Sequence, residues 1–191
     1  MENIYHRYIN LPFELTKPEK IKDFFPEHMR HERIMDHTDP NMEKFAESLG
    51  LQLYLTEVFY TPPNGGIIPI HTDLPEFDNR VKINKTWGPE GGTMRWWKIK
   101  DESKLFGTDM NAYKASGFTE AKHNNLRAEP EDCDLVYEAD TNPASLVNVG
   151  QLHSTYNPGD YGRWTLCFHI WKDGEFVDWY SAQEIFAEYL V

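Results

Sequence analysis

The chain has 191 residues, 31 of them acidic and 19 basic, and this length suits a single domain over residues 1–191 rather than two domains of ordinary size. An aromatic content of 14% excludes a disordered chain, and the net charge of −12 argues against nucleic acid or an anionic membrane as a partner, because an acidic surface repels phosphate groups. The sequence has no apolar run of about 18 residues and no start typical of a signal peptide, and its two cysteines are too few for a disulfide framework. We therefore expect a soluble cytoplasmic protein.

The first fifty residues are predicted to be helical or irregular. Their clearest helix runs from Asn41 to Leu49, because Thr38-Asp39-Pro40 supplies an N-cap and a proline for the first turn. Asp39 also ends the tripeptide His37-Thr38-Asp39, and we interpret it as this cap and not as a metal ligand.

From Leu51 the pattern changes to strand-like runs separated by clusters of Pro, Gly, Asn and Asp. Eight such runs predict a mainly β (α+β) fold over residues 51–180, a double-stranded β-helix of the jelly-roll or cupin-like type. A capping-box pattern at Ser181-Ala182-Gln183-Glu184 predicts a short closing helix over residues 181–191. The predicted strands are Leu51–Tyr60, Gly66–His71, Val81–Lys85, Thr93–Ile99, Asp134–Glu138, Ser145–His153, Arg163–Trp171 and Phe176–Trp179.

Alternation along Arg163–Trp171 predicts which side of this strand faces a pocket. Every second residue from Trp164 to Ile170 is large and apolar, so we expect N-terminal helices to cover that face. The opposite row, from Arg163 to His169, is more polar and is predicted to line a pocket. The long polar stretch over residues 101–132 is predicted to be an insertion that forms a lid over the site.

The tripeptide His71-Thr72-Asp73 is the strongest candidate for metal binding. A His and an Asp two residues apart on a strand point to the same side, and one more imidazole completes the two-histidine, one-carboxylate set that binds non-haem iron. For this third ligand we favour His153 at the end of a strand. His123 lies in the polar insertion, where solvation explains it, and His169 is as well explained by a hydrogen-bonded core position.

Arg163 follows His153 by ten residues, across a turn at Asn157-Pro158-Gly159-Asp160. This order predicts that the imidazole and the guanidinium lie on neighbouring strands. A dicarboxylate would then bind a metal with one end and pair with the guanidinium at the other.

With these candidate ligands and Arg163, the sequence resembles the Fe(II)/2-oxoglutarate-dependent oxygenase superfamily, in particular small prolyl-hydroxylase-like members of the phage and bacterial type. The resemblance spans about residues 51–171. It is carried by His71-Thr72-Asp73, the strand Gly91–Trp97, the run Leu146–His153 and the tripeptide Arg163-Trp164-Thr165.

The resemblance implies that His71, Asp73 and His153 ligate Fe(II), and that Arg163 and Thr165 bind the far carboxylate of 2-oxoglutarate. It also implies that Tyr60 contacts this co-substrate, and that the enzyme couples decarboxylation of 2-oxoglutarate with O2 to C–H oxidation, with ascorbate as a reductant. Trp96-Trp97 and the insertion are the expected enclosure of the substrate, which is a small molecule, an amino acid or a peptide.

Three alternatives stay open on the sequence. Nucleic-acid demethylases of the superfamily carry a second arginine six residues after the first, but here that position is His169. A cupin-like metalloprotein would not use 2-oxoglutarate and would have no need of Arg163. A non-catalytic jelly-roll binding module would leave His153 turned away from His71.

Overall fold

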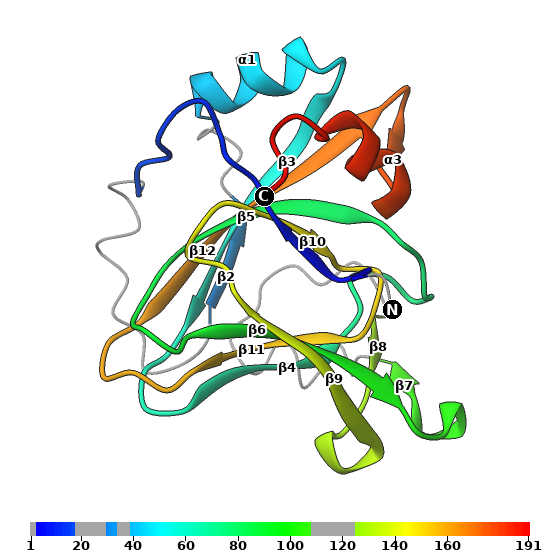
Figure 1. Cartoon of the computed structure of the whole chain (residues 1–191). Helices are drawn as coiled ribbons and strands as arrows, with labels where there is room; N and C mark the ends of the chain where they lie inside the picture. The colour runs from blue at the N-terminus through cyan, green and yellow to red at the C-terminus, as the bar shows by residue number, and fades with distance from the viewer. Residues whose placement is uncertain (1–2, 18–29, 34–38, 108–124) are drawn as a thin grey trace.

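The computed structural model describes residues 3–17, 30–33, 39–107 and 125–191, and the strands of these segments form two antiparallel β-sheets (Figure 1). From β3 onward the chain passes repeatedly from one sheet to the other, so strands that are consecutive in sequence are seldom neighbours in a sheet. This topology confirms the predicted mainly β fold of the jelly-roll type.

One sheet has seven strands in the order β1-β10-β5-β12-β3-β2, with β13 paired to β12. Its centre is the long strand β12, which pairs with β5 on one side and with β3 on the other. The strands are β1 (His6–Tyr8), β2 (Arg30–Arg33), β3 (Gln52–Thr61), β5 (Val81–Trp87), β10 (Ser145–Asn148), β12 (Arg163–Lys172) and β13 (Glu175–Phe176).

The other sheet has six strands in the order β7-β8-β4-β11-β6-β9. A hydrogen bond between the hydroxyls of Thr61 on β3 and Thr155 on β11, with an Oγ1–Oγ1 distance of 3.1 Å, joins the inner faces of the two sheets. The strands are β4 (Gly66–His71), β6 (Thr93–Ile99), β7 (Phe106–Gly107), β8 (Leu126–Arg127), β9 (Cys133–Asp140) and β11 (His153–Asn157).

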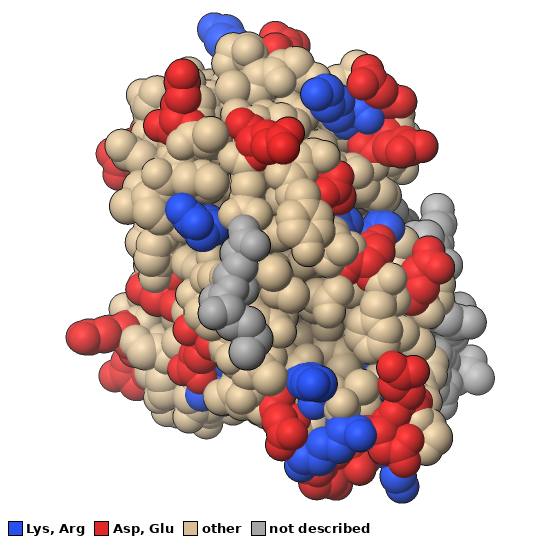
Figure 2. Space-filling model, turned by 45° about the vertical axis from the view of Figure 1, so that its right-hand side comes forward, with Lys and Arg blue, Asp and Glu red and all other residues tan. Residues whose placement is uncertain are grey.

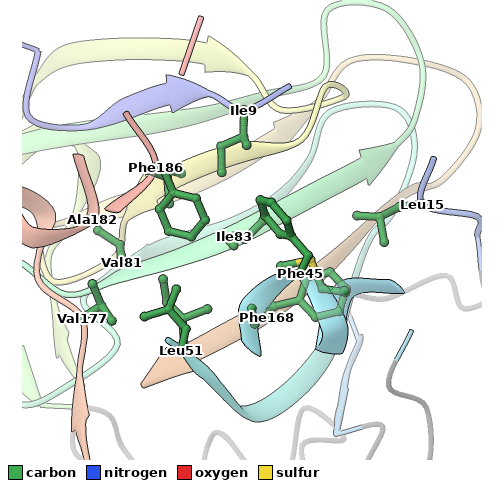
Figure 3. Packing of buried hydrophobic residues seen from close by; sticks show 14 of the residues in the cluster. Ile9, Leu15, Phe45, Leu51, Val81, Ile83, Phe168, Val177, Ala182 and Phe186 are labelled. Atoms are coloured by element: carbon green, nitrogen blue, oxygen red, sulfur yellow. The ribbon is translucent and has the colours of Figure 1, made fainter. Parts of the chain in front are cut away.

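The main hydrophobic core lies on the outer face of the seven-stranded sheet, where the helices α1 (Pro40–Ser48) and α3 (Trp179–Ile185) cover it (Figure 1). Asp39 caps α1 as predicted, because its carboxylate accepts hydrogen bonds from the backbone N–H groups of Asn41 and Met42. Figure 3 shows Phe45 of α1 beside Phe168 of β12. Because these apolar side chains lie on the outer face, the residues of β5 and β12 that point to the inner face are mostly polar.

The predicted strand Ser145–His153 is wrong as one element, because the structure divides it between the two sheets. β10 ends at Asn148 and β11 begins at His153. The side chain of Asn148 turns the chain by accepting a hydrogen bond from Gly150 N–H and donating one to the Ile4 carbonyl. A Cβ atom at Gly150 would lie 1.9 Å from Asp78 Oδ1, so this crossing needs glycine.

Both ends of the chain also differ from the prediction. In the first fifty residues the described part includes two short strands, β1 and β2, beside the single helix α1. Trp179 opens α3 and does not end a strand, because the carboxylate of Asp178 accepts hydrogen bonds from Tyr180 N–H and Ser181 N–H. Asp178, and not Ser181, is therefore the N-cap of the closing helix.

The predicted insertion over residues 101–132 is structured at both ends. It contains β7 and β8, which pair with each other, and two short 3-10 helices, Glu102–Lys104 and Pro130–Asp132. Its middle, residues 108–124 with His123, lies outside the described residues, and the predicted role of the insertion as a lid stays a prediction. Among the described residues, no helix has the length and apolarity that crossing a bilayer requires.

The surface carries charges of both signs. On the face drawn in Figure 2, acidic side chains are spread widely, and the basic ones lie mostly beside them. This mixture agrees with the formal net charge of −12. The expectation that nucleic acid is not a partner stays a prediction.

The buried His6 on β1 is expected to make the folded protein less stable in acid. Its side chain is buried, with Nε2 3.1 Å from Ser145 Oγ, and burial lowers its pKa to about 4. Because the unfolded chain binds this proton more readily, the stabilisation is complete above about pH 6.5 and is lost as the pH falls towards 4. The pKa difference corresponds to roughly 3 kcal/mol.

We expect the free energy of unfolding, measured with urea, to fall between pH 7 and pH 4.5 more steeply for the wild type than for His6→Gln, which has no proton to gain. Parallel curves for the two proteins would contradict the assignment of this effect to His6.

Candidate metal centre

The three predicted ligands come together at the inner face of the six-stranded sheet. His71 ends β4 and His153 begins β11, and the two residues pair directly across these neighbouring strands. Asp73 follows His71 by two residues and therefore returns to the same side. Thr72 between them faces away and accepts a hydrogen bond from Leu126 N–H at β8.

The ligand atoms of the three side chains converge. Asp73 Oδ1 lies 3.6 Å from His71 Nε2 and 3.6 Å from His153 Nε2, and all candidate ligand atoms lie within 4.8 Å of one another. In an octahedron with bonds of about 2.1 Å, neighbouring ligands lie about 3 Å apart. The residues present thus fit a divalent metal after small side-chain movements, and they would fill three of its six positions.

Both imidazoles are oriented for metal binding by the backbone. His71 Nδ1 lies 2.8 Å from the Pro69 carbonyl and His153 Nδ1 lies 2.9 Å from the Gln151 carbonyl. A carbonyl only accepts, so each neutral ring carries its proton on Nδ1 and keeps the lone pair of Nε2. Burial, together with the neighbouring His71, lowers the pKa of His153 to about 3, which keeps this ring neutral.

A lysine that sequence analysis missed lies beside the carboxylate. Lys82 Nζ on β5 is 2.5 Å from Asp73 Oδ2 and 3.1 Å from Glu57 Oε2 on β3. Burial alone would raise the pKa of Asp73, but Lys82, His71 and His153 together outweigh this effect and hold the pKa well below its usual range. Asp73 is therefore ionised, as a metal ligand must be.

Arg163 is a buried cation whose hydrogen bonds, within the described residues, go only to hydroxyl groups. Its guanidinium donates hydrogen bonds to Thr165 Oγ1 at 2.9 Å, Thr141 Oγ1 at 2.7 Å and Thr86 Oγ1 at 3.5 Å. Among the described residues, its Nε has no hydrogen-bond partner. Only 1% of the residue is exposed, and in the described parts of the chain no carboxylate lies within ion-pair distance. Burial lowers its pKa to about 10, so it stays charged at neutral pH.

Two glycines leave room for the stem of Arg163. A Cβ atom at Gly88 would lie 2.9 Å from Arg163 Cγ, and one at Gly92 would lie 3.2 Å from Arg163 Cδ. Gly92 belongs to the segment Gly91–Trp97 that contributed to the resemblance, and close packing against this arginine is a local reason for a glycine at this position.

Tyr60 does not lie with the other predicted site residues. It pairs with Trp164 across β3 and β12, and the two ring centroids are 4.5 Å apart. Paired residues share a face of the sheet, so Tyr60 lies opposite to the face that carries Arg163 and Thr165. The structure therefore does not bring Tyr60 together with these two residues, and its contact with a co-substrate stays a prediction.

The tryptophan pair expected to enclose the substrate has other surroundings. Trp96 is fully buried between the sheets and donates its indole N–H to the Asn148 carbonyl. Trp97, on the opposite face of β6, donates to Ser154 Oγ and packs against Ile70 and its neighbours. Both residues thus make structural contacts.

A signal for the missed residues is present in the sequence. In Val81–Trp87, every second residue from Lys82 is polar, whereas Val81 and Ile83 belong to the outer core. The rule that assigned the polar row of Arg163–Trp171 to a pocket also places Lys82, Asn84 and Thr86 on the inner face. The register shows them opposite His169, Cys167 and Thr165.

Comparisons with known proteins give distant similarities in fold. No family model and no curated protein matches the chain. EvdO2 from Micromonospora carbonacea var. aurantiaca is 15% identical with a TM-score of 0.43, over 82% of this chain and 74% of that one. HygX from Streptomyces hygroscopicus, solved with nickel and 2-oxoglutarate bound, is 12% identical with a TM-score of 0.42, over 81% and 73%. An oxalate oxidase in complex with glycolate is 13% identical with a TM-score of 0.34, over 91% and 77%.

Proposed function

We propose that the protein is an Fe(II)- and 2-oxoglutarate-dependent oxygenase, a hydroxylase acting on a small molecule, an amino acid or a peptide. The observation that carries the proposal is the convergence of His71 Nε2, Asp73 Oδ1 and His153 Nε2, with both imidazole tautomers fixed by backbone carbonyls. Two histidines and one carboxylate with open positions are typical of non-haem Fe(II) oxygenases.

The balance of buried charge supports a dianionic co-substrate. The ionised side chains of Asp73 and Glu57 cancel those of Lys82 and Arg163. A divalent metal then adds two positive charges to a site shielded from water, and a dicarboxylate such as 2-oxoglutarate neutralises them. Arg163, which has no carboxylate partner within the described residues, is the cation that would receive its far carboxylate.

Bound iron and 2-oxoglutarate would supply the oxidation, in which 2-oxoglutarate and O2 are converted to succinate and carbon dioxide while a C–H bond of the substrate is oxidised. The protein contributes position and charge. His71, Asp73 and His153 would hold the metal, and Arg163 with Thr165 would hold the far end of the co-substrate, so that both reactants keep one orientation.

One specific observation bears on each alternative. A module that had lost metal binding would have His153 turned away, yet the ring centroids of His71 and His153 lie 4.4 Å apart. A cupin-like site without 2-oxoglutarate gives no role to a buried guanidinium. The test that separates these functions is therefore the consumption of 2-oxoglutarate.

The experiment measures succinate release by the purified protein with Fe(II), ascorbate and 2-oxoglutarate, alone and with panels of amino acids, peptides and small metabolites. We expect slow iron-dependent succinate release without substrate and faster release with the right class. Metal binding with no succinate under any condition would favour the cupin-like alternative.

A further inference from the structure

Lys82 contacts the candidate metal centre from the opposite sheet. Its Nζ lies 2.5 Å from Asp73 Oδ2, whereas the other oxygen, Oδ1, lies 3.6 Å from the Nε2 atoms of both imidazoles. The two oxygens of this carboxylate therefore face different partners, one the ammonium group and the other the metal position.

The lysine is itself fixed by neighbouring strands. Glu57 Oε2 on β3 lies 3.1 Å from Lys82 Nζ and 2.6 Å from His169 Nε2 on β12. His169 pairs directly with Lys82 across β12 and β5. Lys82 and Glu57 are each only 5% exposed, so the ammonium group is held in place and excluded from bulk water. Burial lowers the pKa of Lys82, but Asp73 and Glu57 outweigh this and raise it above its usual value, so the group is a cation.

We propose that Lys82 is a positioning residue that makes Asp73 bind the metal through Oδ1 alone. A carboxylate with two unoccupied oxygens can bind a metal through both of them, and this would take a further coordination position. With Oδ2 engaged by Lys82, three positions stay open. The inference rests on the metal centre of the proposed function, and it assigns to Glu57 and His169 the role of holding the lysine.

The charge of Lys82 adds a second effect with a definite sign. A cation beside Asp73 opposes binding of a metal ion and favours binding of a dianion to the loaded site. Loss of Lys82 should therefore lower the affinity for 2-oxoglutarate without lowering the affinity for the metal. A general loss of structure would lower both affinities together.

Cobalt(II) tests this role because its visible absorption reports both occupancy and coordination. For Lys82→Met, we expect a Co(II) affinity equal to or higher than that of the wild type and a changed Co(II) spectrum. We expect the affinity of the Co(II)-loaded protein for 2-oxoglutarate to fall by about tenfold or more, because the bound dianion loses a nearby cation.

Two further variants control for folding and for removal of a lysine. The double variant Lys82→Met with Glu57→Gln removes both charges, so no unpaired carboxylate remains at Glu57, and we expect the same changes from it. Lys85→Met removes a lysine from the same strand whose Nζ contacts the Asn142 carbonyl and the Trp87 ring. We expect wild-type metal and co-substrate binding from Lys85→Met.

Three results would overturn the inference. One is an unchanged Co(II) spectrum with unchanged affinities in both Lys82 variants. Another is a parallel loss of Co(II) and 2-oxoglutarate affinity, which would make Lys82 a purely structural contact. A third is weaker 2-oxoglutarate binding with an unchanged Co(II) spectrum, which would mean that Lys82 binds the co-substrate directly. If the wild type itself binds no Co(II), the proposed metal centre falls as well, and this outcome is distinct from the other three.

Discussion

Asp73→Ala is expected to abolish metal-dependent turnover of 2-oxoglutarate while the domain stays folded. The variant removes the only carboxylate among the three converging ligands, whose Oδ1 lies 3.6 Å from both imidazole nitrogens. Loss of a residue that orients a metal ligand typically costs about 10- to 100-fold in metal affinity or activity, so loss of the ligand itself should cost more than about 100-fold in turnover. Titration with Co(II) or Fe(II) and assay of succinate release measure the two effects.

The fold should survive this change because Lys82 keeps its second carboxylate partner, Glu57, at 3.1 Å. A matched control is Asp39→Ala, at the other His-x-Asp tripeptide of the chain. Asp39 caps α1, so its loss should cost about 1 kcal/mol of stability without any effect on turnover. Wild-type succinate release by Asp73→Ala, or its loss in Asp39→Ala, would contradict the assignment of the ligands.

Strands bounded by local signals were predictable from the sequence. Gly66–His71 and Thr93–Ile99 have the predicted bounds, because Gly and Pro clusters flank them and turn chemistry acts within a few residues. The run Ser145–His153 was not predictable, since its division depends on contacts of Asn148 and Gly150 with residues distant in the chain. An apolar run has the same sequence pattern whether all of it lies in one sheet or it crosses from one sheet to the other.

The same distinction applies to the site. His71, Asp73 and His153 were found because their types and spacing restrict the chemistry before the fold is known, and the structure brings them together. The face to which the Tyr60 side chain points depends on the register of β3, because a shift of one residue would move it to the other face of the sheet. Lys82 carries no motif of its own, and only the alternation of polar and apolar residues in β5, which matches that of its neighbour β12, places it on the inner face.

Arg163→Met is expected to weaken binding of 2-oxoglutarate by about 3 kcal/mol, roughly a hundredfold, because the far carboxylate would then be buried without a cationic partner. The affinity for Co(II) should change little, since Arg163 is not among the converging ligands. In the described structure it donates hydrogen bonds only to Thr86, Thr141 and Thr165. The measurement is a titration of 2-oxoglutarate into the Co(II)-loaded protein, together with the apparent KM for succinate release.

The domain should tolerate this substitution. Methionine has a stem of similar length without a charge, so the cost of burying the guanidinium disappears. The hydroxyl that the arginine contacts on Thr86 is already 2.9 Å from Thr141 Oγ1 and 3.1 Å from Thr165 Oγ1, so the three threonines can satisfy one another. We therefore expect a thermal stability close to that of the wild type, which separates a binding defect from unfolding.

Arg95→Met is the matched control for Arg163. Arg95 on β6 makes a partly exposed ion pair with Glu138 at 2.8 Å, and such surface pairs contribute at most about 1 kcal/mol. Its loss should leave both metal and 2-oxoglutarate binding unchanged. If Arg163→Met binds 2-oxoglutarate as the wild type does, the buried guanidinium is not the co-substrate anchor, and the cupin-like function without 2-oxoglutarate becomes the better account of this metal centre.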